Sequence, residues 1–298
     1  MKTIRLLIFL FVILQIFTCT KPYTIDFKNI NKRIVVNSLF LPDSIMKFYL
    51  TEEASLADDV QPDKYKQIEN AQIIIFANDD VIDTANYAGK GNYYADFKPK
   101  ENIFYRIKIN AEGYDEIYAE DKIPESVKID SLYSLKNDDE YYQYQVKIIF
   151  DDPAGEENYY FFSIYWPVEY EGDYWLQEAS YRTNDPAIGE WLNNSFQVPV
   201  FKDDLFNGQR YELSFELHVD ELEGHFEQGN CYFLLFSISK SMYLYMKSYN
   251  EQTPAFGDDP LGDFQRGLME PIPVYTNVEG GLGIFAGYSI STDSLYFE

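Results

Sequence analysis

The side chains best suited to chemistry in this chain are two histidines and several clustered carboxylates. His218 and His225 are separated by an acidic stretch that contains Asp220, Glu221 and Glu223. Imidazole and carboxylate groups bind zinc and other transition metals, so this segment is a candidate metal site. His218 is expected on a strand and His225 beyond an acidic turn, which fixes no spacing between ligands. A solvated loop is therefore the favoured interpretation.

Two groups of acidic residues have the composition of a calcium site, because Ca²⁺ prefers clustered carboxylate and carbonyl oxygens. The first group lies in a predicted hairpin loop and comprises Asp151, Asp152, Glu156 and Glu157, of which the first three are the calcium candidates. The second group lies further along the chain and comprises Asp258, Asp259 and Asp263. Neither group has the ligand spacing of an EF-hand, and ordinary turn chemistry explains both. We expect no bound metal and no cofactor.

Three patterns typical of enzymes are weak in this sequence. Paired carboxylates could serve a glycosidase, but the chain has 49 acidic residues, so close pairs arise by chance. The run Gly280-Gly281-Leu282-Gly283 is followed by no lysine and by a predicted strand, so it favours a tight turn over a phosphate loop. The chain has no Gly-x-Ser-x-Gly segment, and its serines and histidines form no triad pattern. We therefore expect a protein that is not an enzyme.

Aromatic residues gather in the second half of the chain, around a segment between Val168 and Asn193 that is too polar to be entirely core. Exposed tyrosine and tryptophan side chains stack on sugars or dock on partner proteins. The sequence therefore predicts a contact surface, and core packing is the alternative for part of the group. Its members are Trp166, Tyr170, Tyr174, Trp175, Tyr181 and Trp191.

The start of the chain has the pattern of a secretory signal peptide. Lys2 and Arg5 precede an apolar run from Leu6 to Phe17, which is too short to span a bilayer comfortably. Cys19 follows at once and is expected to be lipidated after cleavage, as in bacterial lipoproteins. Residues 1–18 are then the signal peptide and 19–26 a lipidated tether. An ordinary signal peptide is the alternative, because Thr18 and the phenylalanine before it fit the lipidation pattern poorly.

Cysteine usage favours lipidation. The second cysteine, Cys231, lies in a pattern typical of a buried strand, so it is expected to be a small core residue rather than the disulfide partner of Cys19. Several acyl chains on one cysteine, at about 0.8 kcal/mol for each buried methylene, make an effectively permanent anchor.

Charge and composition limit the classes of molecule that this protein is expected to bind. The formal net charge is −25, and it becomes −27 when Lys2 and Arg5 are removed with the leader. Such a surface repels nucleic acid and anionic membranes, and it suits cations, basic protein patches and neutral sugars. Solubility alone also explains the acidity. The 27 tyrosines and 23 phenylalanines favour β-structure.

Short runs of β-branched and aromatic residues, separated by turn residues, predict a first β-sandwich over residues 27–125. In one run Tyr105, Ile107 and Ile109 alternate with polar residues, as expected of a half-buried strand. Residues 54–67 interrupt the series and are expected to form a loop or short helix. The first sandwich is expected to be immunoglobulin-like or transthyretin-like. Its predicted strands are 33–40, 47–51, 71–77, 92–97 and 104–111.

Residues 126–298 are predicted to form a larger antiparallel β-rich domain. A strand over 142–151 and a second over 158–166, joined by a turn at Pro153, are expected to pair as a hairpin. Helical spacing of Tyr243, Met246 and Tyr249 predicts one helix over 239–252, with Ser239 as its cap. Residues 253–271 are expected to be a loop. Further strands are predicted over 194–200, 209–219, 231–238 and 284–290.

The chain resembles the Bacteroidota lipoproteins grouped as domain of unknown function 4249, over nearly all of the mature protein. The segments that carry the resemblance are Val35-Val36-Asn37, 70–75, Asp151-Asp152-Pro153 with Asn158-Tyr159-Tyr160, 203–208 and, most specifically, 274–288. The resemblance implies an outer-membrane lipoprotein with an N-terminal immunoglobulin-like module and a larger β-rich domain. It also implies a frequent association with TonB-dependent receptors, and it carries no established activity.

These observations give two expectations for function. The first is a non-enzymatic outer-membrane lipoprotein at the extracellular face, acting as an accessory or structural subunit of an outer-membrane β-barrel complex. That complex would be a TonB-dependent transporter or a barrel-assembly or secretion machine. The alternative is a substrate-binding lipoprotein that captures a glycan, peptide or metal for a transporter. The membrane is expected to be contacted through the lipid anchor, and nucleic acid is not an expected partner.

Overall fold

Strands dominate this chain, as its many tyrosine, phenylalanine and β-branched residues predict. The computed structural model describes residues 32–54, 65–139, 143–170, 172–189, 191–192, 198–218, 229–252 and 273–297. All of them belong to one unit of the chain, residues 32–54 and 60–298. Within this part the predicted fold class is confirmed: the chain is mainly β, with antiparallel sheets in a sandwich-like arrangement and one α-helix.

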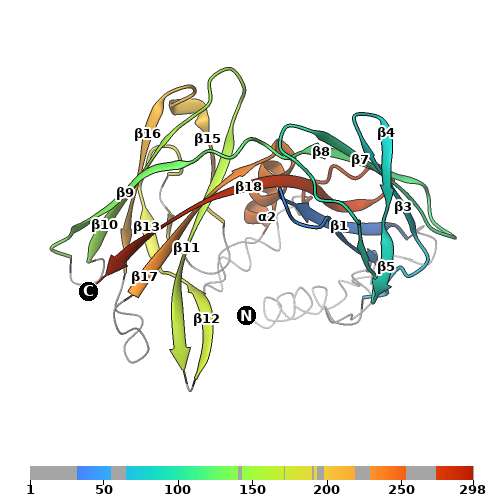
Figure 1. The fold of residues 1–298 in the computed structure, drawn as a ribbon, viewed down its shortest axis with the longest axis horizontal. Coiled ribbons are helices and arrows are strands. Elements are labelled where there is room, and N and C mark those ends of the chain that lie inside the picture. Colours follow the sequence, from blue (N-terminus) through green and yellow to red (C-terminus); the bar gives the residue numbers. More distant parts are fainter. Residues whose placement is uncertain are drawn as a thin grey trace, which may run out of the picture. The chain divides into compact units, whose positions relative to one another are not determined.

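A nine-stranded sheet runs through both halves of the described chain (Figure 1). Its strands follow the order β12-β11-β17-β18-β1-β2-β6-β5, and β15 also pairs with β11. Strands from the beginning and the end of the chain therefore meet in one sheet. Their bounds are β1 (Ile34–Phe40), β2 (Lys47–Glu52), β5 (Asn86–Gly89), β6 (Asn92–Tyr94), β11 (Tyr159–Tyr170), β12 (Asp173–Glu178), β15 (Val200–Lys202), β17 (Gly229–Ile238) and β18 (Leu282–Phe297).

A four-stranded sheet of order β4-β3-β7-β8 packs against the first part of the large sheet. Its strands are β3 (Gln72–Ala77), β4 (Asp80–Thr84), β7 (Phe104–Asn110) and β8 (Ile117–Lys122). The predicted alternation holds in β7, where Tyr105, Ile107 and Ile109 are buried. They meet apolar residues of β1 and β2, such as Val36 and Leu50, in one hydrophobic core.

A five-stranded sheet of order β14-β13-β16-β10-β9 packs against the other part of the large sheet. Its strands are β9 (Ile129–Lys136), β10 (Tyr144–Asp151), β13 (Tyr181–Thr183), β14 (Trp191–Leu192) and β16 (Arg210–Leu217). The rings of Phe162 on β11 and Phe215 on β16 stack across this second core, with centroids 5.1 Å apart. Aromatic pairs of this kind add to the free energy of apolar burial.

The predicted hairpin of β10 and β11 is wrong. β10 pairs with β9 and β16, whereas β11 pairs with β12, β15 and β17. The connection between β10 and β11 crosses from the five-stranded sheet to the nine-stranded sheet. The buried side chains of both strands face each other in the second core. Alternation in two neighbouring strands predicts burial of one face, and it does not distinguish pairing within a sheet from packing between sheets.

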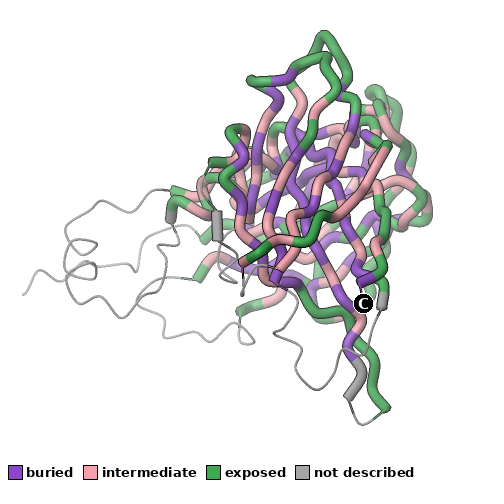
Figure 2. The backbone as a smooth tube through the Cα atoms, turned by 90° about the vertical axis from the view of Figure 1, so that its left-hand side faces the viewer, coloured by how far each residue is buried: buried purple, intermediate pink, exposed green. Residues whose placement is uncertain are grey.

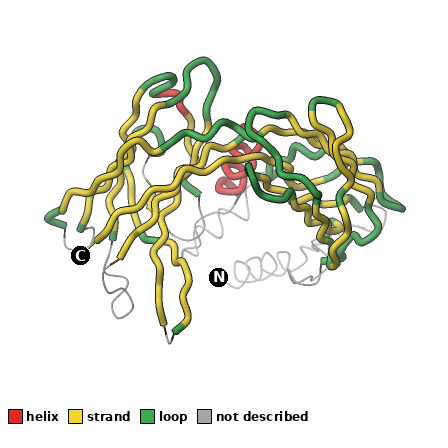
Figure 3. The backbone as a smooth tube through the Cα atoms, in the orientation of Figure 1, coloured by secondary structure: helices red, strands yellow, loops and turns green. Residues whose placement is uncertain are grey.

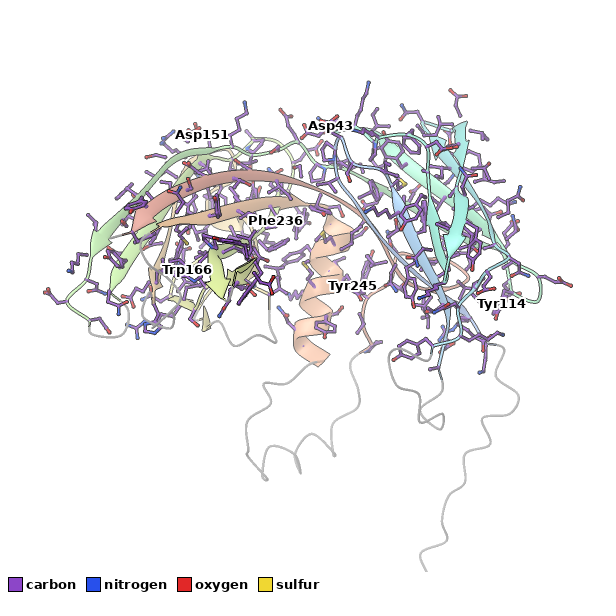
Figure 4. The ribbon with its side chains drawn as sticks, turned by 60° about the horizontal axis from the view of Figure 1, so that its bottom comes forward. Asp43, Tyr114, Asp151, Trp166, Phe236 and Tyr245 are labelled. Atoms are coloured by element: carbon purple, nitrogen blue, oxygen red, sulfur yellow. The ribbon has the colours of Figure 1, made fainter. Side chains whose placement is uncertain are left out.

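The predicted helix is present as α2 (Lys240–Gln252). The Ser239 hydroxyl accepts a hydrogen bond from the Met242 N–H at 3.2 Å, which confirms the predicted cap. Figure 3 shows this helix among the strands, and Figure 4 shows Tyr245 on it near Phe236. Both residues belong to a third apolar cluster between α2 and the large sheet.

The last strand, β18, contributes to all three clusters through the alternation of its side chains. Phe285 lies in the first core, whereas Phe297 lies in the second. Both have odd numbers, and the even-numbered Ile284 and Ala286 lie beneath α2. Because side chains alternate between the faces of a strand, both smaller sheets pack on one face of the large sheet and α2 packs on the other.

The pairing of β18 with β1 is parallel, whereas antiparallel pairing was expected throughout. Gly283 has φ +96°, and a Cβ atom there would lie 2.0 Å from the Val36 carbonyl oxygen. At Gly287 a Cβ atom would lie 2.5 Å from the Lys122 carbonyl oxygen. At position 283 only glycine permits both the positive φ and the close approach, and at position 287 glycine permits the close approach.

Most predicted strands are present with small shifts in their bounds. β18 begins near the predicted position and extends seven residues beyond Ile290. The predicted strand over 194–200 lies largely outside the described residues, and so do most of segment 54–67, loop 253–271, and the leader and tether with Cys19. The first hydrophobic core is built mainly from residues before position 125 and the second from residues after it, and β18 contributes to both. The division into domains 27–125 and 126–298 stays a prediction.

We expect Gly283→Ala to lower the free energy of unfolding by several kcal/mol or to prevent folding, because its methyl group has no room beside Val36. Gly89→Ala is the matched control: Gly89 has a similar φ of +98°, and a Cβ atom there would have nothing within 4 Å. That variant should lose about 1–3 kcal/mol, the usual cost of backbone strain. Chemical denaturation measures both, and equal losses would contradict the close-packing explanation.

Candidate functional site

The predicted aromatic contact surface is divided by the structure between the core and the solvent. Trp166 and Tyr181 are 2% and 1% exposed and belong to the second core. Their inclusion in a contact surface is therefore corrected, because both occupy inward positions of their strands. For Tyr170 and Trp191 the structure describes only the backbone, which pairs with Asp173 and Thr183.

Strand β12 carries the exposed part of the predicted surface. Tyr174 is 72% exposed and Trp175 is 44% exposed. Leu176, which the sequence did not single out, is 59% exposed. All six residues of β12 are exposed, as Figure 2 shows for the hairpin at the bottom of the view. Three adjacent large apolar side chains on one exposed strand have the composition of a binding hot spot.

The calcium candidates do not converge on one point. Asp151 lies at the surface (Figure 4) and forms an ion pair with Arg210 at 3.1 Å. Asp152 is buried and accepts a hydrogen bond from the Tyr160 hydroxyl at 2.5 Å. Glu156 forms an ion pair with Lys122. Each carboxylate has its own partner, so the structure does not bring the three together as ligands.

Asp152 and Asp203 instead fix two loops to one another. Asp203 begins a single 3₁₀ turn, η3 (Asp203–Leu205), and is 1% exposed. Its Oδ2 accepts the Asn158 N–H at 3.0 Å and the Asn207 side-chain amide at 2.9 Å. Asp152 Oδ2 accepts the Gly208 N–H at 2.8 Å. Burial raises the pKa of Asp152, with the nearby Asp203 charge adding to the increase.

The remaining candidates have structural surroundings. His218 is buried, and its backbone N–H donates to the Ser180 carbonyl at 3.0 Å. His225 and the acidic group at 258–263 lie outside the described residues. Cys231 is a free, fully buried thiol, as predicted, and burial raises its pKa. Gly280 lies in a turn at φ +77°, as the glycine run predicts.

A pocket of about 650 Å³ lies beside the start of α2. Its most buried acid is Asp121, which is 9% exposed and lies on β8. The Asp121 Oδ2 accepts the Ser239 hydroxyl at 2.5 Å and the Gly287 N–H at 3.2 Å. One carboxylate therefore joins β8, α2 and β18. Burial raises the pKa of Asp121 to about 6.

The pocket is lined by both signs of charge and by two aromatic residues, of which Phe104 is 56% exposed and Tyr159 is 7% exposed. Lys122 and Lys240 lie near its mouth, paired with Glu156 at 3.0 Å and with Glu157 at 3.4 Å. The rings of Phe104 and Tyr159 contribute to the lining. Sequence reasoning missed this site. Its one signal was an acid at position 121, in register with the inward-facing Ile117 and Ala119 of β8.

Within the described residues, no group of three or more histidine, cysteine or acidic side chains is arranged to hold a metal ion. The helices in that part of the chain are also too short or too polar to cross a membrane.

Fold and surface together define a mainly β protein whose large sheet carries an exposed aromatic edge strand. The family model described as Domain of unknown function (DUF4249) matches residues 20–294, so the chain belongs to this family. Comparison with curated proteins gave no match.

The segments that carry the family resemblance interlock in the structure. Val35, Val36 and Asn37 pair in parallel with Leu282, Gly283 and Ile284. The loop after β10 is joined to the Asp203–Gly208 segment by the hydrogen bonds of Asp152 and Asp203. These segments thus position strands and loops relative to one another.

We expect Asp203→Ala to lower the free energy of unfolding by about 1–3 kcal/mol, because the half-buried Asn158 N–H and the Asn207 side-chain amide lose their buried acceptor. Asp204→Ala, at a half-exposed carboxylate paired with Lys202, should change it by less than about 0.5 kcal/mol. Urea denaturation of both variants provides the comparison. Similar losses of unfolding free energy in the two variants would contradict the conclusion that Asp203 fixes the two loops to one another.

Asp121 should make stability depend on pH. The folded protein binds a proton at Asp121 below about pH 6, whereas the unfolded carboxyl does so only near its ordinary pKa of 3.8. Stability contributed by this group therefore rises as the pH falls through 6. Between about pH 7.5 and about pH 4.5, the wild type should gain about 2 kcal/mol relative to Asp121→Asn. A constant difference between the two proteins would contradict the assignment.

Proposed function

We propose that this chain is a non-enzymatic lipoprotein, lipidated at Cys19, that acts as an accessory subunit of an outer-membrane β-barrel complex at the extracellular face. The observation that carries the proposal is the exposed apolar strand β12, where Tyr174, Trp175 and Leu176 are all accessible. Exposed clusters of large apolar side chains mark interaction sites in soluble domains. The leader and Cys19 supply the membrane attachment on this proposal.

The state of the carboxylates supports a binding role over catalysis. Buried Asp152 and Asp203 are occupied by backbone and amide donors of neighbouring loops. Asp121 is occupied by Ser239 and Gly287. Each of these acids stabilises a junction between elements.

A second candidate is a substrate-binding lipoprotein that captures a small ligand, such as a glycan, for a transporter. The pocket beside Asp121 favours it, because its volume of about 650 Å³ lies in the range usual for small-molecule sites. The rings of Phe104 and Tyr159 would supply apolar contact to a sugar, and Lys240 and Asn158 would supply hydrogen bonds.

Purification from detergent-solubilised native membranes tests the subunit proposal. A C-terminally tagged chain should bring down an outer-membrane β-barrel protein in a fixed stoichiometry, identified by mass spectrometry. Cys19→Ser should release the chain from the membrane fraction, because the acyl chains that hold it are lost. Mass spectrometry of the mature N-terminus provides the control for cleavage and lipidation.

The opposite result favours the second candidate. If no barrel co-purifies and the isolated protein binds a glycan that Phe104→Ala abolishes, the chain is a substrate-binding lipoprotein. Leu205→Ala is the matched control, because Leu205 is 59% exposed, close to the 56% of Phe104, and does not line that pocket.

A further inference from the structure

The outer edge of β12 has a defined hydrogen-bonding pattern. Among the described strands, β12 ends the large sheet and pairs with β11 alone, in a continuous register from Tyr170↔Asp173 to Tyr165↔Glu178. Immediately beyond this ladder, the Ala179 N–H donates to the Ile164 carbonyl at 2.9 Å. Antiparallel partners alternate between bonded and non-bonded pairs, so Tyr174, Leu176 and Glu178 direct their N–H and C=O groups away from β11.

β12 differs from the other edge strands that the structure describes, of which β15 has only three residues. Register shifts interrupt the pairing of β4, β5 and β9, and β14 has two residues. β8 is covered at Tyr118 by a bridge to Glu279. β12 has the sequence Asp-Tyr-Trp-Leu-Gln-Glu, with no proline, lysine or register shift. A flat, apolar edge of this kind pairs readily with another strand.

Apolar side chains flank this edge on both faces of the sheet. Tyr174 and Leu176 alternate with Trp175, so the first two project from one face and Trp175 from the other. Trp175 lies opposite Val168, which is buried in the second core. A strand added at the edge would therefore contact an aromatic side chain on each face.

The charge of the hairpin selects the partner. Between Trp166 and Tyr181 the sequence has four acidic residues and no lysine, arginine or histidine. The whole chain carries a formal charge of −25. An added strand with lysine or arginine residues would meet opposite charge along its length, whereas an acidic strand would be repelled.

We propose that β12 captures an extended, basic segment of the partner protein by strand addition, with the backbone groups of Leu176 and Glu178 forming part of the new ladder. This inference rests on the proposed subunit function and names the site and the chemistry of its partner. Main-chain hydrogen bonds supply affinity in this mode, and alternating side chains supply specificity.

Hydrogen exchange on the complex purified through the tagged chain tests the proposal directly. The N–H groups of Leu176 and Glu178 should exchange at least tenfold more slowly in the complex than in the isolated protein, because they gain acceptors. The exposed edge strand β4 should keep its rates. Unchanged rates in β12 within an intact complex would overturn strand addition and leave the subunit function standing.

Substitutions at Leu176 separate backbone pairing from side-chain contact. Leu176→Thr keeps the outward N–H, and Leu176→Pro removes it without affecting the β11 ladder. We expect Leu176→Pro to reduce recovery of the partner at least tenfold and Leu176→Thr to reduce it only a few-fold. Val81→Thr, at an exposed site on β4, is the control. Equal recovery with all three variants would overturn the proposal.

A photo-crosslinker at Gln177 identifies the captured segment. The attached peptide should come from the co-purified protein, contain at least two lysine or arginine residues, and be extended. Attachment to lipid, to an acidic segment, or to nothing in an intact complex would contradict the assignment. If the wild-type chain recovers no partner at all, both the subunit function and strand addition fail.

Discussion

The structure depends on the backbone pairing of β18 with β1 on one side and with β17 on the other. β1 is the first described strand of the chain and β18 the last, so this pairing closes the sheet between sequence ends. Parallel pairing requires a long connection, and here the rest of the described chain supplies it. Gly283 permits the close approach of β18 to β1, and Gly287 permits its close approach to Lys122 of β8, because a Cβ atom at either position would overlap a carbonyl oxygen. Loss of β18 would remove residues from both cores together.

This arrangement explains how an exposed hairpin can have a fixed position. β11 begins inside the second core, with Tyr160 and Phe162 buried, and then extends to the segment that pairs with β12. The buried part of β11 is held by β17, which is in turn held by β18. The apolar residues of β12 are thus presented by a continuous sheet, and little conformational entropy remains to be lost when a partner binds.

Local sequence patterns predicted many of the individual elements, whereas the pairing of strands distant in sequence could not be predicted from them. The alternation of Tyr105, Ile107 and Ile109 identified β7, and the cap at Ser239 identified α2, because both signals are local. The hairpin of β10 and β11 was predicted wrongly, because face burial does not reveal which strands pair. The parallel pairing of β1 was missed for the same reason.

The site was predicted in part, again according to how local its signals are. Tyr174 and Trp175 stood out because they lie in a polar segment, and both are exposed. Trp166 and Tyr181 lie near them in sequence but point into the core, because each occupies an inward position of its strand. The roles of Asp121 and Asp203 depend on donors from distant loops, so residue type alone could not identify them.

Native-state hydrogen exchange in β2 and β17 tests most directly the claim that β18 joins the two cores into one cooperative unit. β2 belongs to the first core and β17 to the second, and neither spans both. If β18 couples them, the slowest amides of the two strands should exchange with opening free energies within about 1 kcal/mol of each other and of global unfolding. Exchange of β2 through an opening at least about 3 kcal/mol easier, with β17 still protected, would show that the cores unfold separately and contradict the account.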